Sequence, residues 1–306
     1  MSPTSRVTSS PKIIRTVSEL VQWRRSTQQK IGLFATMGAL HEGHASVLRK
    51  IRPRCEVSVL SIYVNPTQFG PKEDFSRYPR SLENDLKIAA QEGVDIVFVP
   101  ESSEIYPAGY STYIEETQLS QPLCGKYRPA FFRGVATVVL KLFHLVRPDL
   151  TLFGLKDAQQ FFVVSKMVHD LNLDLKVEGA ATVRESDGLA LSSRNAYLST
   201  EEREKAPLIY RELSRVRDEL VGASAQDQRS KNELREILES AKNRLEKQGF
   251  QVQYLDCLEL PLLNTPSTYI SGHPYLVAIA AFLGSTRLID NVILNPEKLR
   301  GQILNE

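Results

Sequence analysis

Short apolar runs alternate with amphipathic stretches in the first part of this chain. Four β-rich runs lie at residues 30–36, 56–64, 94–100 and 173–180. Stretches with apolar side chains at helical spacing lie between them, at residues 46–52, 81–93, 136–146 and 158–171. Strands that alternate with helices are typical of a parallel sheet covered by helices. We therefore predict an α/β, doubly wound, Rossmann-like domain.

The pattern changes after about residue 188. Residues 199–221 and 231–249 have the spacing of amphipathic helices, and Ser199 and Glu202 stand at capping-box distance. Three β-rich runs follow, at residues 250–260, 275–283 and 286–294. Helices followed by strands indicate an α+β unit.

Two domains follow from this change. We expect a Rossmann-like domain over residues 1–187, with residues 1–18 as a flexible tail, and a smaller C-terminal α+β domain over residues 188–306. Ser81 is the expected N-cap of the helix in residues 81–93, and Gly93 is its expected stop.

Composition narrows the class of partner. The 306 residues carry 38 basic and 36 acidic side chains, so the net charge predicts neither nucleic acid nor a membrane surface as a partner. Three cysteines without metal-ligand spacing fit a reducing compartment. No apolar run reaches the length of a membrane span. We expect a cytoplasmic protein, although the Ser- and Thr-rich, acid-free N-terminus faintly resembles a mitochondrial presequence.

Polar motifs follow three of the predicted strands and one further short apolar segment, PDLTLF (residues 148–153). They read TMGALHEGH (residues 36–44), NPTQFG (65–70), FGLKDAQQ (153–160) and TVRESDGLALSSRN (182–195). In a doubly wound sheet, ligands bind outside the carboxyl ends of the strands, so these motifs mark the expected site.

The histidines of HEGH have three interpretations. Zinc is disfavoured, because His41 and His44 stand three apart instead of four. A capping role in the turn stays open. Phosphate binding is favoured, because Gly38 and Gly43 let a ligand approach the backbone and the following helix presents free N–H groups.

Other side chains suit a nucleotide and a small polar substrate. Lys156 is a candidate phosphate contact, with a surface ion pair to Asp157 as the alternative. Gln68 and Gln160 can hold hydroxyl and carboxylate groups. Hard oxygen ligands for magnesium are offered by four acids, Glu73, Asp74, Glu83 and Asp85, among which composition does not choose.

The motif H-x-G-H, paired with LSSRN (191–195), resembles the signature of the nucleotidyltransferase α/β superfamily. In that superfamily, a mobile loop rich in Ser and basic residues covers the triphosphate. Four longer blocks resemble one family closely, the pantothenate synthetases or pantoate-beta-alanine ligases. They are TMGALHEGHASVLRK, SIYVNPTQFGPKEDFSRYPRSLENDL, GKYRPAFFRGVATVVLKLFHLVRPDLTLFGLKDAQQFFV and TVRESDGLALSSRNAYLS.

The resemblance implies a set of site residues. Its ATP-binding positions are Met37, Gly38, Ala39, Leu40, His41, Glu42, Gly43, His44, Gly154, Leu155, Lys156, Asp157, Val183, Leu191, Ser192, Ser193 and Arg194. The catalytic positions are His44, which corresponds to the family's proton donor, with His41, Lys156 and Arg194. Gln68 and Gln160 would hold pantoate, with Gln68 also near beta-alanine, and Asp85 would bind magnesium.

The resemblance also implies a reaction. Pantoate's carboxylate would attack ATP to give pantoyl adenylate and pyrophosphate, and beta-alanine would then displace AMP to give pantothenate. The expected partners are these small molecules and Mg²⁺, the expected assembly is a homodimer, and the C-terminal domain would act as a lid.

The chain departs from the family pattern at four positions. Phe131 replaces a frequent His, Leu191 a Met and Ala35 a Pro, and Asn84 stands where some members have a second acid. Two other functions are weighed. A tRNA-dependent synthetase would need a large basic domain, for which the residues after 188 leave little room, and a non-catalytic module would have lost phosphate-contacting side chains that are present here.

Overall fold

The structure, a computed structural model, describes residues 10–71, 73–221 and 228–299. Two compact units divide the chain. The first comprises residues 1–116, 130–153 and 164–178, and the second residues 117–129, 154–163 and 179–306. The two are described separately below. Within the described ranges, no helix combines the length and apolar character that a membrane crossing requires.

A six-stranded sheet has the order β1-β4-β3-β2-β5-β6. Its strands are β1 (Lys12–Ile14), β2 (Ile31–Thr36), β3 (Val57–Ile62), β4 (Ile96–Phe98), β5 (Leu150–Gly154) and β6 (Lys176–Ala180). β2 pairs in parallel with β3 on one side and with β5 on the other. The chain therefore winds outward in both directions from β2 and β5, which makes their junction the topological switch point of a doubly wound sheet.

Helices and short 3₁₀ turns connect these strands. They are α1 (Val17–Arg25), α2 (Glu42–Ile51), η1 (Arg52–Arg54), η2 (Pro66–Gln68), α3 (Leu82–Gln91), α4 (Ser102–Ile105), α5 (Cys124–Tyr127), α6 (Phe131–Val146), η3 (Leu155–Asp157) and α7 (Ala158–Asp170). A Cβ atom on Gly134 of α6 would lie 2.4 Å from the Thr67 carbonyl oxygen, so only glycine lets α6 pack this closely on η2.

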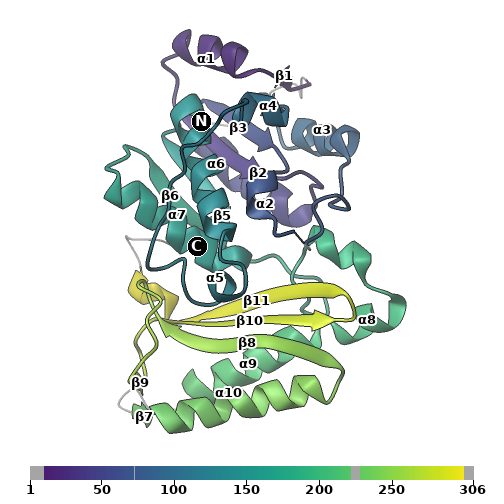
Figure 1. Cartoon of the computed structure of the whole chain (residues 1–306), viewed down its shortest axis with the longest axis vertical. Helices are drawn as coiled ribbons and strands as arrows, with labels where there is room; N and C mark the ends of the chain where they lie inside the picture. Colours follow the sequence, from purple (N-terminus) through teal and green to yellow (C-terminus); the bar gives the residue numbers. More distant parts are fainter. Residues whose placement is uncertain (1–9, 72, 222–227, 300–306) are drawn as a thin grey trace, which may run out of the picture. The chain divides into compact units, whose positions relative to one another are not determined.

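The second unit contains an antiparallel sheet. Its strands are β8 (Phe250–Glu259), β10 (Tyr275–Leu283) and β11 (Thr286–Leu294), in the order β11-β10-β8. Helices α9 (Leu208–Val221) and α10 (Lys231–Glu246) lie along one face of this sheet (Figure 1). Their apolar side chains share one buried core with the strands. The remaining elements are η4 (Ser193–Tyr197), α8 (Thr200–Lys205), η5 (Pro296–Leu299) and the strand pair β7 (Gln228–Ser230) and β9 (Thr268–Ile270).

The α/β class and the smaller C-terminal α+β arrangement are confirmed. All the β-rich runs named from the sequence contain strands, and the Ser199–Glu202 capping box is present. Residues 199–221 form two helices instead of one, because Pro207 has no N–H to donate. Ser81 occupies the N-cap of α3, but its side chain makes no capping hydrogen bond.

The expected tail is shorter than residues 1–18. β1 pairs in parallel with β4, and Thr16 caps α1, so the ordered chain starts before residue 18. Residues 1–9 lie outside the described residues. The domain boundary at 187/188 and the lid role of the second domain stay predictions.

A buried carboxylate ties β6 to η1. Glu178 accepts hydrogen bonds from Arg54 (Nη2 to Oε1, 2.8 Å) and forms an ion pair with Lys176 (Nζ to Oε1, 2.6 Å). Burial alone raises the pKa of Glu178, but the hydrogen bonds from Arg54 and Lys176 outweigh it and hold that pKa below its ordinary value.

We expect Glu178→Gln to lower the free energy of unfolding at about pH 7 by about 2 kcal/mol. Since the native pKa is depressed, the unfolded chain binds more protons between the two pKa values, and the contribution is lost as the pH falls through the native pKa. Urea unfolding at about pH 7 and about pH 3 measures the difference in the free energy of unfolding between the parent protein and Glu178→Gln. This difference should shrink on acidification. Glu83→Gln, at an exposed ion pair with Lys87, is the control. A difference that does not depend on pH would contradict the conclusion that ionised Glu178 stabilises the fold.

Candidate active site

The loop after β2 has an unusual backbone. Gly38 and Ala39 both have positive φ, +81° and +52°. Such a φ costs a non-glycine residue of the order of 1–3 kcal/mol, so the surrounding structure must hold Ala39 in place. The Thr36 hydroxyl helps, because it accepts the Gly38 N–H at 3.2 Å and donates to the Ser61 carbonyl at 2.9 Å.

Asp85 of α3 supplies the main support. Its carboxylate accepts the N–H groups of Ala39 (3.0 Å) and Leu40 (2.7 Å), and the residue is 1% exposed. Burial raises the pKa of Asp85, and the two backbone donors offset part of that rise. A Cβ on Gly38 would lie 2.8 Å from Asp85 Oδ2, so position 38 needs glycine for space as well as for φ.

The two histidines cap α2. His41 is the N-cap residue, and its Nδ1 accepts the Gly43 N–H at 3.1 Å. His44 Nδ1 accepts the His41 N–H at 3.2 Å, which completes a capping box, and the two rings lie 4.1 Å apart. A neutral imidazole whose Nδ1 accepts a hydrogen bond carries its proton on Nε2. The cap therefore sets each ring as an Nε2–H donor, so the capping and phosphate-binding interpretations are compatible.

The side-chain amide of Gln68 contacts two residues of the first unit, Asn65 and Met37. Its Oε1 accepts from Asn65 Nδ2 at 3.0 Å, and its Nε2 contacts Met37 Sδ at 3.0 Å. Asn65 Nδ2 also donates to the Gly134 carbonyl at 3.1 Å, and Asn65 is 1% exposed. The amide of Gln68 is thus oriented by Asn65. Sequence reasoning missed Asn65, although its place at the start of NPTQ was a signal.

In the second unit, η3 carries the predicted lysine. Lys156 Nζ lies 3.9 Å from Asp157 Oδ2, so the ion-pair alternative exists alongside any ligand role. Gln160 lies half-buried in the first turn of α7. Its neighbour Gln159, which sequence reasoning passed over, receives the Cys124 N–H at 3.0 Å and donates to the Leu119 carbonyl at 2.9 Å.

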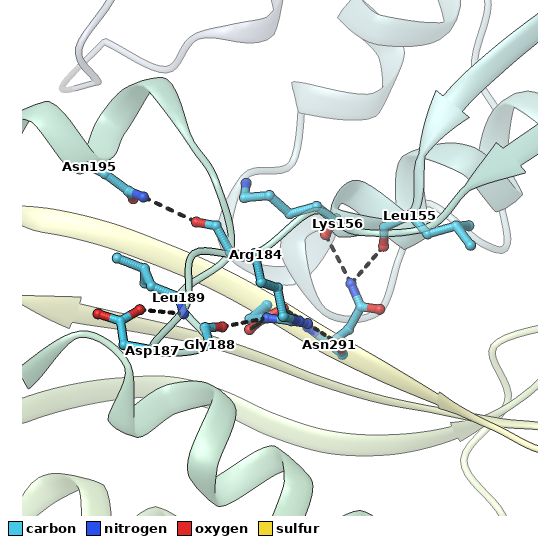
Figure 2. A network of polar contacts seen from close by, with 10 residues as sticks. Leu155, Lys156, Arg184, Asp187, Gly188, Leu189, Asn195 and Asn291 are labelled. Atoms are coloured by element: carbon cyan, nitrogen blue, oxygen red, sulfur yellow. Dashed lines mark hydrogen bonds and ion pairs between the residues drawn. The ribbon is translucent and has the colours of Figure 1, made fainter. Parts of the chain in front are cut away.

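Residues 183–195 form a tight turn followed by η4. Arg184 and Ala190 make an isolated antiparallel bridge, and the Leu191 N–H donates to the Val183 carbonyl at 3.0 Å. Ser192 caps η4 by accepting the Arg194 N–H at 3.3 Å. The side chain of Asn195 donates through Nδ2 to the Ala190 carbonyl at 3.1 Å (Figure 2). The LSSRN motif is therefore anchored at both ends.

The structure shows side-chain contacts for three of the four candidate acids for magnesium. Glu83 pairs with Lys87 on the surface, and Glu73 accepts the Gly70 N–H at 3.1 Å. Asp85 is the acid whose contacts to the loop after β2 are seen. Over the described residues, no three His, Cys, Asp or Glu side chains gather to hold a metal.

Other predicted positions have structural partners. Glu42 forms an ion pair with Arg49 on the exposed face of α2. Gly154 ends β5 and precedes η3. Phe131, where the family pattern often has His, packs edge-on against Phe132 with ring centroids 4.8 Å apart.

Comparisons with known proteins agree with one another. The family model described as pantoate-beta-alanine ligase matches residues 12–293. A pantothenate synthetase of Syntrophobacter fumaroxidans is 46% identical over 291 residues, which are 93% of this chain and 99% of that protein. Another from Thermotoga petrophila is 45% identical over 286 residues, 92% of this chain and 99% of that protein.

Solved structures agree at the level of the fold. The crystal structure of pantothenate synthetase from Thermus thermophilus has a TM-score of 0.82 and 40% identity, and covers 92% of this chain and 98% of its own. Pantoate-beta-alanine ligase from Francisella tularensis, complexed with beta-gamma ATP and beta-alanine, has a TM-score of 0.75 and 33% identity over 92% of this chain and 97% of its own. This chain therefore belongs to the pantoate-beta-alanine ligase family.

Proposed function

We infer that the chain is an AMP-forming ligase that condenses (R)-pantoate with beta-alanine to give pantothenate, using ATP. The observation that carries this conclusion is the match to full-length pantothenate synthetases, which spans 99% of a relative at 46% identity. The ATP and beta-alanine in the Francisella tularensis complex support the same substrates here.

We propose two chemical steps. A pantoate carboxylate oxygen attacks the α-phosphorus of ATP, the bond to the bridging oxygen breaks, and pyrophosphate leaves with pantoyl adenylate remaining. The beta-alanine amine then attacks the acyl carbon, AMP leaves, and the amine loses a proton. Neither step needs a protein nucleophile, so positioning and charge neutralisation do the catalysis.

We propose that ATP is contacted at the positions that the family resemblance implies. The set is Met37 to His44, Gly154 to Asp157, Val183 and Leu191 to Arg194. In the first unit, the Nε2–H groups set by the cap suit phosphate oxygens, and His44 is the proposed proton donor. Parallel strands β2 and β5 lead into the first two segments at the switch point, which supports this assignment.

Lys156 and Arg194 are the proposed cationic contacts of the second unit. Each would neutralise charge that develops on the phosphates. Ser192, Ser193 and Arg194 are further proposed to move when ATP binds, because an acyl adenylate must be shielded from water. Gln68 and Gln160 are the proposed pantoate contacts, and the fixed amide of Gln68 suits that role.

Magnesium is part of the proposal, with Asp85 as its protein ligand. A carboxylate has about four lone-pair sites, and the two backbone donors use two of them. Mg²⁺ is usually held by one or two carboxylates together with substrate phosphates, which fits a single acid. When bound, the ion would neutralise phosphate charge. A homodimer and a cytoplasmic location also stay predictions.

Pyrophosphate exchange tests the first step. We expect labelled pyrophosphate to enter ATP only when pantoate is present, because the reverse reaction needs pantoyl adenylate. His44→Ala should lower this exchange about 100-fold, since it removes a positioned donor. His144→Ala, on exposed α6 surface, is the matched control and should exchange at the parent rate. Exchange without pantoate, or at full rate in His44→Ala, would refute the assignment.

The second step should discriminate among amines. We expect AMP release with beta-alanine to exceed that with glycine or 4-aminobutyrate at least tenfold, because a one-methylene change is worth about 10- to 200-fold in a fitted pocket. Steady-state AMP formation at equal amine concentrations measures it. Equal rates with all three amines would show that the chain has no fitted beta-alanine pocket.

Asp85→Asn separates metal binding from loop support. If Asp85 holds Mg²⁺, the half-saturating Mg²⁺ concentration for pyrophosphate exchange should rise about tenfold or more. Glu83→Gln, two residues away and exposed, should leave it unchanged. A lower exchange rate with an unaltered Mg²⁺ requirement would show that Asp85 only supports the loop after β2.

A further inference from the structure

Two consecutive polar residues are buried in β11. Asp290 is 5% exposed and Asn291 is 7% exposed. Side chains alternate between the faces of a strand, and Leu288, Val292 and Leu294 lie in the core shared with α9 and α10. Asp290 shares their face, whereas Asn291 points to the opposite face. Burying a carboxylate or an amide costs free energy unless it is hydrogen-bonded. The hydrogen-bond partners of Asp290 and Asn291 are therefore the key to their role.

Asp290 is paired with Arg184. The guanidinium donates to both carboxylate oxygens, at 2.6 and 2.9 Å, and also to the Gly188 carbonyl at 3.1 Å. It lies over the Tyr210 ring, 3.6 Å from the centroid. The same ion pair also binds both backbone polar groups of Asn291. Its N–H donates to Asp290 Oδ1 at 2.8 Å, and its carbonyl accepts from Arg184 Nη2 at 3.3 Å. The backbone of Asn291 is therefore fixed on both sides.

The side chain of Asn291 reaches η3. Its Nδ2 donates to the carbonyls of Leu155 and Lys156, both at 2.9 Å (Figure 2). An amide has two N–H donors, and each is used here. These bonds hold two successive peptide groups of η3, and thereby set the direction in which the Lys156 side chain leaves the backbone.

We propose that Asn291 is a positioning residue that acts through Lys156. This inference rests on the proposed function, in which Lys156 contacts the phosphates of ATP. The two carbonyl groups of η3 need hydrogen-bond donors, and Asn291 supplies them. What an apolar residue cannot supply is the pair of donors that orients the two carbonyls of η3.

A double-mutant cycle tests the proposal. Asn291→Ala should slow pantoate-dependent pyrophosphate exchange about tenfold or more in the parent enzyme. In the Lys156→Ala background, the same change should cost less than about twofold, because the group that it positions is already gone. The KM for beta-alanine should not change. Asn264→Ala, at an exposed asparagine of the same unit, should be neutral in both backgrounds.

Two other variants keep the test decisive if circular dichroism shows that Asn291→Ala is not folded. Asn291→Ser keeps one donor and should show a smaller loss with the same non-additivity. Asn291→Asp has nearly the same volume but directs an acceptor at two carbonyl oxygens, and it should be slower than Asn291→Ser. A loss as large in Lys156→Ala as in the parent would overturn the inference. Absence of pantoate dependence in the parent, or no effect of Lys156→Ala alone, would instead count against the proposed function.

Discussion

The hydrogen bonds from Ala39 and Leu40 to Asp85 are the constraint on which the first unit's candidate site depends. They hold a non-glycine residue at positive φ directly after β2, and so direct the chain into the N-terminus of α2. The position of His41 as N-cap, and of both rings above the first turn, follows from that direction. Burial raises the pKa of Asp85, and the hydrogen bonds from the two backbone N–H groups offset part of that rise while satisfying both donors.

The histidines show that a structural and a ligand-binding role need not exclude each other. In each ring, Nδ1 accepts a backbone N–H and Nε2 carries the proton of the neutral form. A side chain that caps a helix through one atom thus presents a donor through another, near the partial positive charge of the helix N-terminus. The contact between Met37 and Gln68 joins this loop to the segment that contains the oriented glutamine.

Much of the fold was predictable because the strands of a sheet covered on both faces are short and mostly apolar, as in residues 31–35. The strand β1 was missed because it has three residues and lies at the edge, where two of the three are exposed. Site residues that belong to contiguous motifs could be named from the sequence. Asn291 could not, since its partner in η3 lies 136 residues away. Asn65 belongs to the motif NPTQFG, but its bond to Gly134, 69 residues away, could not be inferred from that motif.

In each unit, a buried side chain binds two successive backbone groups of a turn, but the donor and acceptor roles are reversed. In the first, the loop after β2 presents N–H groups, and a carboxylate from α3 accepts them. In the second, η3 presents carbonyl groups, and an amide from β11 donates to them. A carboxylate at position 291 would repel the two carbonyl oxygens, and an amide at position 85 would set its own N–H group against a backbone donor. The choice of Asp at one place and Asn at the other therefore follows from which backbone groups each turn leaves without a helical or strand partner.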